Sequence, residues 1–339
     1  MKIKDKILFI YPIFSSFVSA DFEFLSEKYE VQKFQYVHKK KITTHFWNQI
    51  KLKFWLFKNI FGAKAVYVWF ADYHSFIPIL FAKLFNKKSF LVLGGYDVTY
   101  IPDLDYGSLN NPLRAFCAKQ SLKNATVNFA VSKYVANQAI SIVPRANVEL
   151  IYNGVNFAKF ESISGSRKNR VLTVGIIDSI KRIKIKGIDV FLKVASVMPN
   201  YEFVIVGITQ KMQKELGNVP NNLVMVDQVK QSELFSFYND SKVYCQFSIV
   251  ESFCLALAEA MACGCTGVVT NAGALPEIIG NSGFIVSTES LANIKEIIEK
   301  AIAQNDKGNF ESVKMIEDNF NLDYRKERIC DVFETYGVK

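Results

Sequence analysis

The sequence contains no run of eighteen or more apolar residues, so no segment is expected to cross a bilayer as a helix. Its six cysteines follow no disulfide framework, and Cys263 and Cys265 lack the second ligand pair that a zinc site needs. The amino terminus leads within a few residues into a short strand, so we expect no secretory leader. A cytoplasmic protein with free thiols and no bound metal is therefore predicted.

No internal repeat, low-complexity tract or nucleic-acid-binding module is found, although the net charge is +9. The positive charge gathers in segment 33–64, where lysines alternate with phenylalanines and tryptophans. One alternative is an amphipathic helix docked on its own sheet, with the lysines solvated; we favour it because so many aromatic side chains must pack somewhere. The other is a surface on anionic lipid, which would place the protein peripherally on the inner face of the membrane. No nucleic-acid partner is expected.

The 339 residues suffice for two domains of ordinary size. Strand-like and helix-like runs alternate through both halves, which favours mostly parallel sheets with helices on both faces. A break at Asn153–Asn156 and a polar stretch at 162–169 indicate a linker between the halves. Residues 291–304 and 323–336 are expected to form helices near the carboxyl terminus.

The most informative segment is Val250–Gly264, an apolar stretch that contains Glu251 and Glu259. Glutamate is rarely buried without a partner. A strand-like run enters the segment and a helix-like run leaves it, which places Glu251 at the carboxyl end of a strand and Glu259 inside the next helix. Ligands bind at this end of an open α/β sheet, and the helix amino terminus offers N–H groups to a phosphate. Two carboxylates beside such a site suit the hydroxyls of a nucleotide-sugar.

Glu251 through Glu259 resembles the E-x7-E motif of the retaining glycosyltransferases with the GT-B fold, in particular family four, the group 1 glycosyl transferases. Residues 259–265, 268–270 and 273–279 continue that family's pattern. The resemblance implies an α/β protein with two facing Rossmann-like domains, mostly parallel sheets and a deep interdomain cleft. The expected domains are an acceptor-binding domain at 1–158, a donor-binding domain at 166–318, and a last helix within 319–339 that returns to the first domain.

The resemblance implies that Glu251 binds hydroxyls of the transferred sugar and that Glu259 binds hydroxyls of the ribose. The turn at 226–229 would lie by the nucleobase. Cys254 stands where the family often has glycine. The loop whose backbone N–H groups would face the donor comprises Ser252, Phe253, Cys254 and Leu255.

The departing nucleoside diphosphate gains negative charge, so cations aimed at it stabilise the transition state more than the ground state. Many family members use a Gly-Arg…Lys-Gly element for this purpose. Here Ile176 follows Gly175, so the arginine is missing from its usual place, while Lys186 matches the lysine. The loop between them is longer than usual, and we expect it to bring Arg182 to the diphosphate. Lys181 and Lys184 are rivals for the same contact.

The acceptor would bind the first domain. Many relatives read His-Gly-x-Asp where this chain has Gly94 through Asp97, so the histidine is absent. Asp97 is predicted either to orient the acceptor or take its proton, or else to cap a turn. Asp72 and His74 follow the preceding strand within reach of the cleft, and Ser15–Ser16 offers hydroxyls and amides to phosphates.

The resemblance thus implies a retaining glycosyltransferase. It would move a sugar from a nucleotide-diphosphate sugar, UDP in preference to GDP, to a hydroxyl of a glycan or lipid-linked glycan in cell-surface polysaccharide synthesis. No cofactor or metal is expected, and the Asp-x-Asp at 103–105 is interpreted as a loop. Two alternatives stay open: a nucleotide-sugar epimerase of similar fold, and a non-catalytic partner of another glycosyltransferase, which Gly94 and Ile176 would suit.

Overall fold

The computed structural model describes residues 4–37, 42–159 and 166–339, so Lys39–Lys41 and half of the predicted polar stretch, residues 162–165, lie outside the described residues. The chain divides into two compact units. Unit 1 comprises Met1–Asn153 and Asp323–Lys339, and unit 2 comprises Gly154–Leu322. Within the described ranges, no helix is both long enough and apolar enough to span a membrane.

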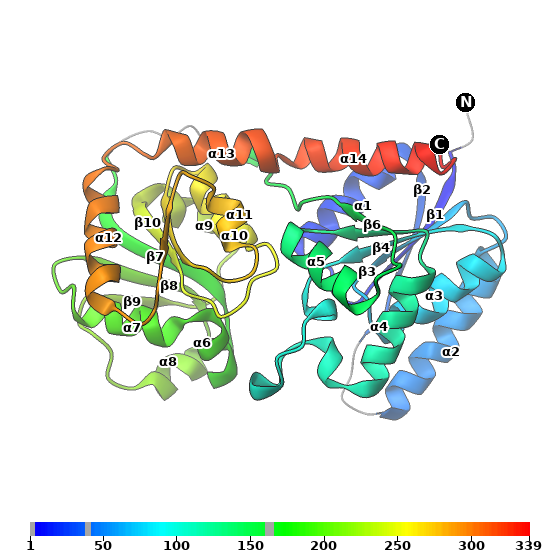
Figure 1. The fold of residues 1–339 in the computed structure, drawn as a ribbon, viewed down its shortest axis with the longest axis horizontal. Helices are drawn as coiled ribbons and strands as arrows, with labels where there is room; N and C mark the ends of the chain where they lie inside the picture. Colours follow the sequence, from blue (N-terminus) through cyan, green and yellow to red (C-terminus); the bar gives the residue numbers. More distant parts are fainter. Residues whose placement is uncertain (1–3, 38–41, 160–165) are drawn as a thin grey trace. The chain divides into compact units, whose positions relative to one another are not determined.

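Unit 1 contains a six-stranded, fully parallel sheet in the order β2-β1-β3-β4-β5-β6 (Figure 1). Its strands are β1 (Lys6–Tyr11), β2 (Glu30–Gln35), β3 (Ala65–Trp69), β4 (Lys88–Leu93), β5 (Val127–Ala130) and β6 (Val148–Leu150). The central strands are mostly apolar and almost wholly buried, which is typical of a sheet covered on both faces. The edge strand β2 was not predicted, because its exposed, polar sequence carries no run of apolar residues.

Helices α1 (Ser16–Lys28) and α14 (Leu322–Thr335) cover one face of this sheet, and α2 (Ile42–Asn59), α3 (Tyr73–Leu84) and α4 (Pro112–Asn124) cover the other (Figure 1). A buried ion pair joins α14 to α1: the Arg325 guanidinium donates to both carboxylate oxygens of Asp21, at 2.8 and 2.7 Å. The Tyr67 hydroxyl donates to Asp21 at 2.6 Å, and Arg325 also donates to the Ile151 carbonyl at 3.0 Å. The last helix is therefore fixed to unit 1 by charge as well as by packing.

Unit 2 contains a second six-stranded parallel sheet, in the order β12-β11-β10-β7-β8-β9. Its strands are β7 (Lys168–Ile177), β8 (Glu202–Ile208), β9 (Leu223–Val226), β10 (Ser241–Gln246), β11 (Thr266–Thr270) and β12 (Phe284–Val286). On one face α7 (Ile188–Ser196) and α12 (Leu291–Ala303) pack together over an apolar core. On the other, α10 (Leu255–Ala262) contacts α9 (Gln231–Asp240), α11 (Leu275–Ile279) and α13 (Phe310–Phe320).

The predicted α/β class with parallel sheets is confirmed in both units. In unit 2, β7 and β10 are neighbours, and the connection after β7 runs to β8 on one side while the connection after β10 runs to β11 on the other. Ligands of open α/β sheets bind outside the carboxyl ends of the strands at such a reversal. The segments that follow β7 and β10 are therefore where a site of this unit is expected, and these segments carry Lys186 and Glu251.

Candidate functional site

The segment after β7 is a helix and not the lengthened loop that was predicted. Ser179 accepts a hydrogen bond from the Arg182 amide at 3.4 Å and begins α6 (Ile180–Lys186). Ile183 and Ile185 are both buried, although residues two apart point to different sides of a helix, so this short helix is covered on more than one side. The prediction failed because this alternation does not have the usual period of a helix.

Gly187 ends α6 at φ +67°, a left-handed conformation that favours glycine. A Cβ atom added there would lie 2.0 Å from the Phe247 carbonyl oxygen, in the loop after β10. The Ile249 amide of that loop also donates to the Ile185 carbonyl, at 2.9 Å. These close approaches fix the end of α6 against the loop and place Lys186 beside Glu251.

We expect Gly187→Ala to destabilise this part of unit 2 by about 2 kcal/mol or more, since it adds a steric clash to a left-handed backbone. Hydrogen exchange of peptides from α6 and α7, followed by mass spectrometry, would measure the loss. Gly217→Ala is the control, because Gly217 also has a positive φ, +63°, but open space around its Cβ position. Equal losses in the two variants would contradict a role for the Phe247 contact.

Lys186 and Glu251 form an ion pair of 2.6 Å between Nζ and Oε1. Glu251 is nearly buried, and its Oε1 also accepts from the Ser248 hydroxyl at 2.9 Å and from Gln246 Nε2 at 3.4 Å. The Tyr244 hydroxyl donates to Gln246 Oε1 at 3.0 Å. The sequence analysis did not identify these partners of Glu251. The available signal was the presence of two polar residues, Gln246 and Tyr244, inside an otherwise apolar strand.

Glu259 lies in α10, as predicted, and is nearly buried. Gln231 Nε2 donates to its Oε1 at 2.9 Å, and the Tyr238 hydroxyl donates to its Oε2 at 3.2 Å. Burial, followed by the charge of Glu259, raises the pKa of Tyr238 well above its ordinary value, so this phenol keeps its proton and can donate. Gln231 and Tyr238 both come from α9, which follows the turn at 226–229. Neither was predicted as a site residue.

Cys254 occupies the N-cap position of α10 with φ +66°, again in the left-handed region. No side chain caps the first N–H groups of this helix at that position. The Cys254 thiol lies 3.5 Å from Oε1 of Gln246, the residue whose amide bonds to Glu251. Burial raises the pKa of this thiol, so it stays protonated. Glycine adopts this left-handed conformation without steric cost, which explains why the resembling family often has glycine at this position.

The Arg182 side chain is half exposed and does not join Lys186. Its Nε lies 3.2 Å from Asp178 Oδ1, and its NH1 donates to the Ile176 carbonyl at 3.3 Å. Gly175, by contrast, lies beside Lys186, since a Cβ there would be 4.0 Å from the lysine side chain. Lys186, Glu251, Gly175 and the start of α10 are thus brought together, and Arg182 pairs with a carboxylate of its own segment.

In unit 1, the Asp97 carboxylate accepts hydrogen bonds from three backbone N–H groups. The donors are Gly95 at 2.6 Å, Ala71 at 2.9 Å and Gly94 at 3.3 Å. Burial raises the pKa of Asp97 and these N–H groups lower it. Burial has the larger effect, and the pKa rises to about 6. Such bonding is that of an aspartate that fixes the loops after β3 and β4, which is one of the two roles that the sequence left open.

At position 94, where many relatives have histidine, the space for a side chain is taken up by Phe70. A Cβ atom on Gly94 would lie 2.1 Å from an edge carbon of the Phe70 ring, so this ring fills the space beside Gly94. Phe70 itself has φ +70°, which is unusual for a residue with a bulky side chain.

Asp72 and His74 have structural partners in unit 1. Asp72 caps α3 and forms an ion pair with Arg114 through both carboxylate oxygens. Burial alone would raise the pKa of Asp72, but Arg114 and other neighbours outweigh burial and hold the pKa below its ordinary value. His74 is fully buried, with Nε2 2.7 Å from the Trp69 carbonyl, and burial lowers its pKa. Ser15 precedes α1 without a side-chain cap bond.

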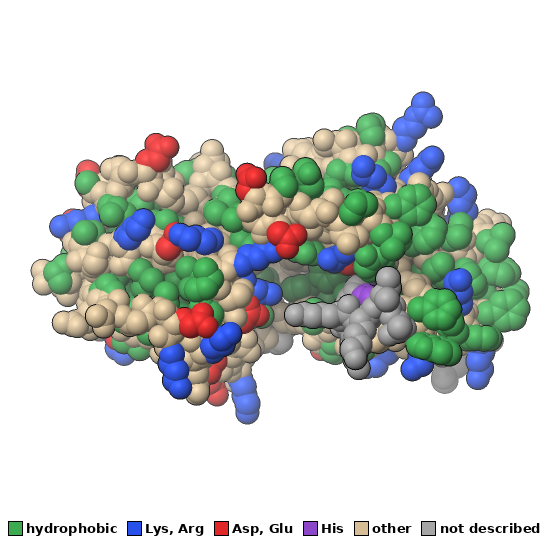
Figure 2. Space-filling view, turned by 90° about the horizontal axis from the view of Figure 1, so that it is seen from below, with side chains coloured by type: hydrophobic (Ala, Val, Ile, Leu, Met, Phe, Trp, Pro, Cys, Tyr) green, Lys and Arg blue, Asp and Glu red, His purple; other side chains and the backbone are tan. Residues whose placement is uncertain are grey.

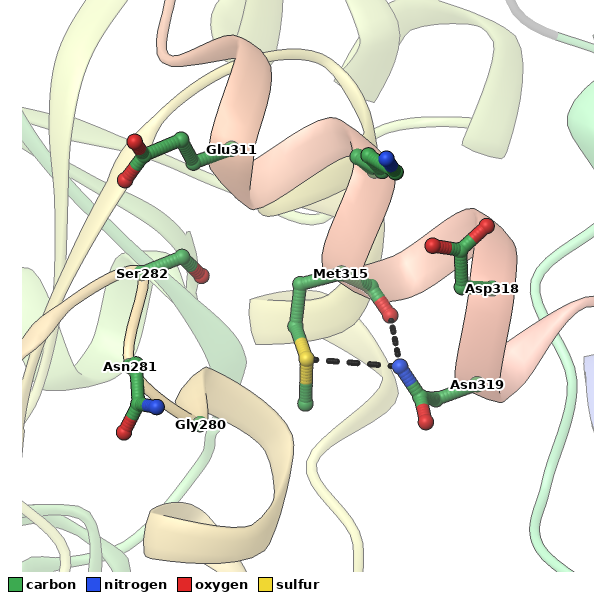
Figure 3. Close-up of a pocket in the computed structure, with 8 residues that line it drawn as sticks. Gly280, Asn281, Ser282, Glu311, Met315, Asp318 and Asn319 are labelled. Carbon is green, nitrogen blue, oxygen red and sulfur yellow. Dashed lines mark hydrogen bonds between the residues drawn. The ribbon is translucent and has the colours of Figure 1, made fainter.

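A surface hollow of about 420 Å³ lies elsewhere in unit 2, between α13 and the loop after α11 (Figure 3). Glu311, Met315, Asp318 and Asn319 face it from the helix, and Gly280–Ser282 face it from the loop. The Asn319 side chain donates to the Met315 carbonyl at 2.9 Å across the helix turn. None of the predicted site residues lines this hollow. Among the described residues, no group of three or more His, Cys, Asp or Glu side chains could hold a metal ion.

Residues 161–319 match the family model described as glycosyl transferases group 1. Unit 2 is a group 1 glycosyl transferase domain. A phosphatidylinositol N-acetylglucosaminyltransferase subunit of Arabidopsis thaliana is 26% identical to the chain over 167 residues. That match covers 47% of this chain and only 37% of the plant protein, so the chain spans well under half of this relative.

Two solved structures extend the fold comparison to both units. Sucrose-phosphate synthase from Thermosynechococcus elongatus has a TM-score of 0.80 and 14% identity, over 98% of this chain and 99% of its own. HepE of Anabaena, solved with UDP and glucose, has a TM-score of 0.75 and 14% identity, over 98% and 100%. The glycosyl transferase domain and unit 1 together therefore have the GT-B fold, which confirms the resemblance inferred from the sequence.

Proposed function

We propose that the chain is a retaining glycosyltransferase that moves a sugar from a nucleotide-diphosphate sugar, UDP in preference to GDP, to a hydroxyl of a glycan or lipid-linked glycan. The observation that carries the proposal is the Lys186–Glu251 pair at the sheet reversal, beside the uncapped start of α10. An ammonium and open N–H groups suit a diphosphate, and carboxylates suit sugar hydroxyls. The UDP-bound relative HepE supports the choice of base.

In this proposal Lys186 leaves Glu251 when the donor binds and moves to the diphosphate. The 2.6 Å pair keeps the lysine at the site without a ligand, and Glu251 keeps Ser248 and Gln246 as partners afterwards. Its carboxylate then accepts hydrogen bonds from sugar hydroxyls. As the bond between sugar and phosphate breaks, charge builds on the diphosphate, and the lysine stabilises it most strongly at that moment.

Glu259 would bind the two ribose hydroxyls. Gln231 and Tyr238 hold the carboxylate in one orientation before the donor arrives, so little ordering is needed on binding. The turn at 226–229 precedes the helix that supplies both residues, which is consistent with a nucleobase nearby. Retention would need no protein nucleophile if the leaving phosphate takes the acceptor proton.

Ligand-observed NMR with a panel of UDP- and GDP-sugars is the direct test. We expect one donor to bind, and Glu259→Ala to weaken its binding by roughly 10- to 100-fold, since charge-assisted hydrogen bonds to the ribose contribute about 1.5–3 kcal/mol. Glu299→Ala, which removes an exposed helical glutamate of α12, is the control and should bind normally.

If no donor in the panel binds, or if Glu259→Ala binds as well as the control, the donor site is wrong and the non-catalytic alternative gains support. Binding without transfer to any acceptor would also favour a non-catalytic partner.

A further inference from the structure

Helix α2 has two apolar sides. Leu52 and Leu56, and Ile60 directly after the helix, are fully buried against the rest of unit 1. On another side, Phe46, Phe54 and Phe57 are exposed, and Phe54 reaches 74%. The amphipathic helix docked on unit 1 with solvated lysines, which the sequence favoured, is therefore found. The expected packing of the aromatic side chains inside holds for Trp55, in contact with Phe34, but is wrong for most of the others.

The exposed side chains lie along one side of α2 and the turn that follows it. Phe46, Phe54, Phe57 and Phe61 follow one another at helical spacing, and Trp47, also exposed, lies next to Phe46. The rings of Phe57 and Phe61 are 5.6 Å apart, and that of Phe61 lies 5.0 Å from Phe85. Phe85 adjoins Leu84, which is 73% exposed at the end of α3. We call Phe46, Trp47, Phe54, Phe57, Phe61 and Leu84 the aromatic stripe.

The charge around the stripe has one sign. Between residues 42 and 90 the sole acidic residue is Asp72, which is buried and paired with Arg114. The same stretch contains seven lysines: Lys51, Lys53, Lys58, Lys64, Lys83, Lys87 and Lys88. Figure 2, seen from the side on which α2 lies in Figure 1, shows hydrophobic side chains gathered with basic side chains on this part of unit 1.

We propose that the aromatic stripe and its lysines bind the surface of an anionic lipid bilayer, with α2 lying in the plane of the interface. Apolar rings enter the headgroup region while lysines contact acidic lipids, the arrangement expected of interfacial helices. A second copy of the chain fits less well, because a symmetric pair would bring the same lysines together. The proposal goes beyond sugar transfer and does not depend on the Glu251 site.

Vesicle co-sedimentation without any donor tests it. We expect the full chain to bind vesicles of phosphatidylcholine with roughly one third phosphatidylglycerol, and not phosphatidylcholine alone. Lys51→Gln/Lys53→Gln/Lys58→Gln should lower the affinity roughly 100-fold, since each lysine contributes about 1 kcal/mol near such a surface. Phe54→Ser/Phe57→Ser should lower it at least about tenfold, through lost burial of the rings.

Matched controls come from unit 2. Lys211→Gln/Lys214→Gln/Lys295→Gln removes the same charge, and Ile285→Ser/Phe310→Ser removes exposed apolar side chains. Both should bind vesicles as the parent does. The emission of Trp47, exposed in free protein, should shift to the blue on binding, and Trp47→Phe should lose that shift.

Three results would overturn the proposal: no binding to the anionic vesicles, equal losses in the stripe and control variants, or a parent that self-associates or binds an oligonucleotide through the stripe but ignores vesicles. Failure here would leave donor binding untouched, so the two proposals are separable.

Discussion

Replacing Glu251 with Gln, or Lys186 with Met, is expected to lower the rate of sugar transfer by about 100- to 1,000-fold. In the proposed mechanism, each substitution removes a charge that would face the reacting centre. Lys186→Met also leaves the nearly buried Glu251 carboxylate without the counter-charge that lies 2.6 Å away, and Glu251→Gln leaves the partly buried Lys186 ammonium without one. Since the acceptor is unidentified, the rate is measured as release of nucleoside diphosphate from the donor found by NMR, with water as acceptor.

Lys184→Met is the matched control for this prediction. Lys184 lies on the same short helix, but its ammonium is exposed and pairs with Asp189 at 2.7 Å. We expect its rate to stay within about twofold of the parent, as for an exposed ion pair. If Lys184→Met or Arg182→Met loses activity and Lys186→Met does not, the phosphate contact belongs to that residue. Donor binding retained in Glu251→Gln would place the loss in the reaction step.

Asp21→Asn is expected to destabilise unit 1 by about 3–5 kcal/mol, because it leaves the Arg325 guanidinium buried without a counter-charge. Asp21 is fully buried and accepts two bonds from Arg325 and one from Tyr67. Burial lowers the pKa of Arg325, but the charge of Asp21 raises it by more, so the guanidinium remains charged.

Urea unfolding followed by tryptophan fluorescence measures this loss selectively. All three tryptophans, Trp47, Trp55 and Trp69, belong to unit 1, so the signal reports unit 1 alone. Arg328→Ala is the control on the same helix, since Arg328 is exposed and lies 3.7 Å from Glu149; its cost should be under about 1 kcal/mol.

The double variant Asp21→Leu/Arg325→Leu sharpens the prediction. It should be less destabilised than Asp21→Asn, because no buried charge is left unpaired. A parent-like unfolding midpoint for Asp21→Asn would show that the ion pair does not fix α14 to unit 1.

The parallel sheets and the helix that carries Glu259 could be predicted because their apolar runs are long and continuous. The strand β2 and the helix α6 could not, since both mix charged and apolar residues at short spacing. Burial of such elements depends on neighbours that are distant in sequence. Ile183, for example, is buried in the core of unit 2, and Ile185 lies where the loop after β10 bonds to its carbonyl.

For the candidate site, Glu251 and Glu259 were predicted because carboxylates in an apolar segment are conspicuous, and Lys186 was predicted because it matches the lysine of the resembling family. Their partners Gln246, Gln231 and Tyr238 were not, because neutral polar residues occur throughout strands and helices without marking a function. The position of Arg182 rested on an assumed loop. Once α6 forms, Asp178 lies four residues before the arginine and competes for it.

The packing of Phe70 against Gly94 restricts the order in which this site can change by mutation. A side chain introduced at position 94 collides with the ring, so a histidine gained there first would be selected against on stability alone. Loss of the ring must come first, and glycine at position 70 would suit its φ of +70°. An imidazole at position 94 is therefore reachable in two steps but not in one, and an engineered restoration should begin with Phe70→Gly.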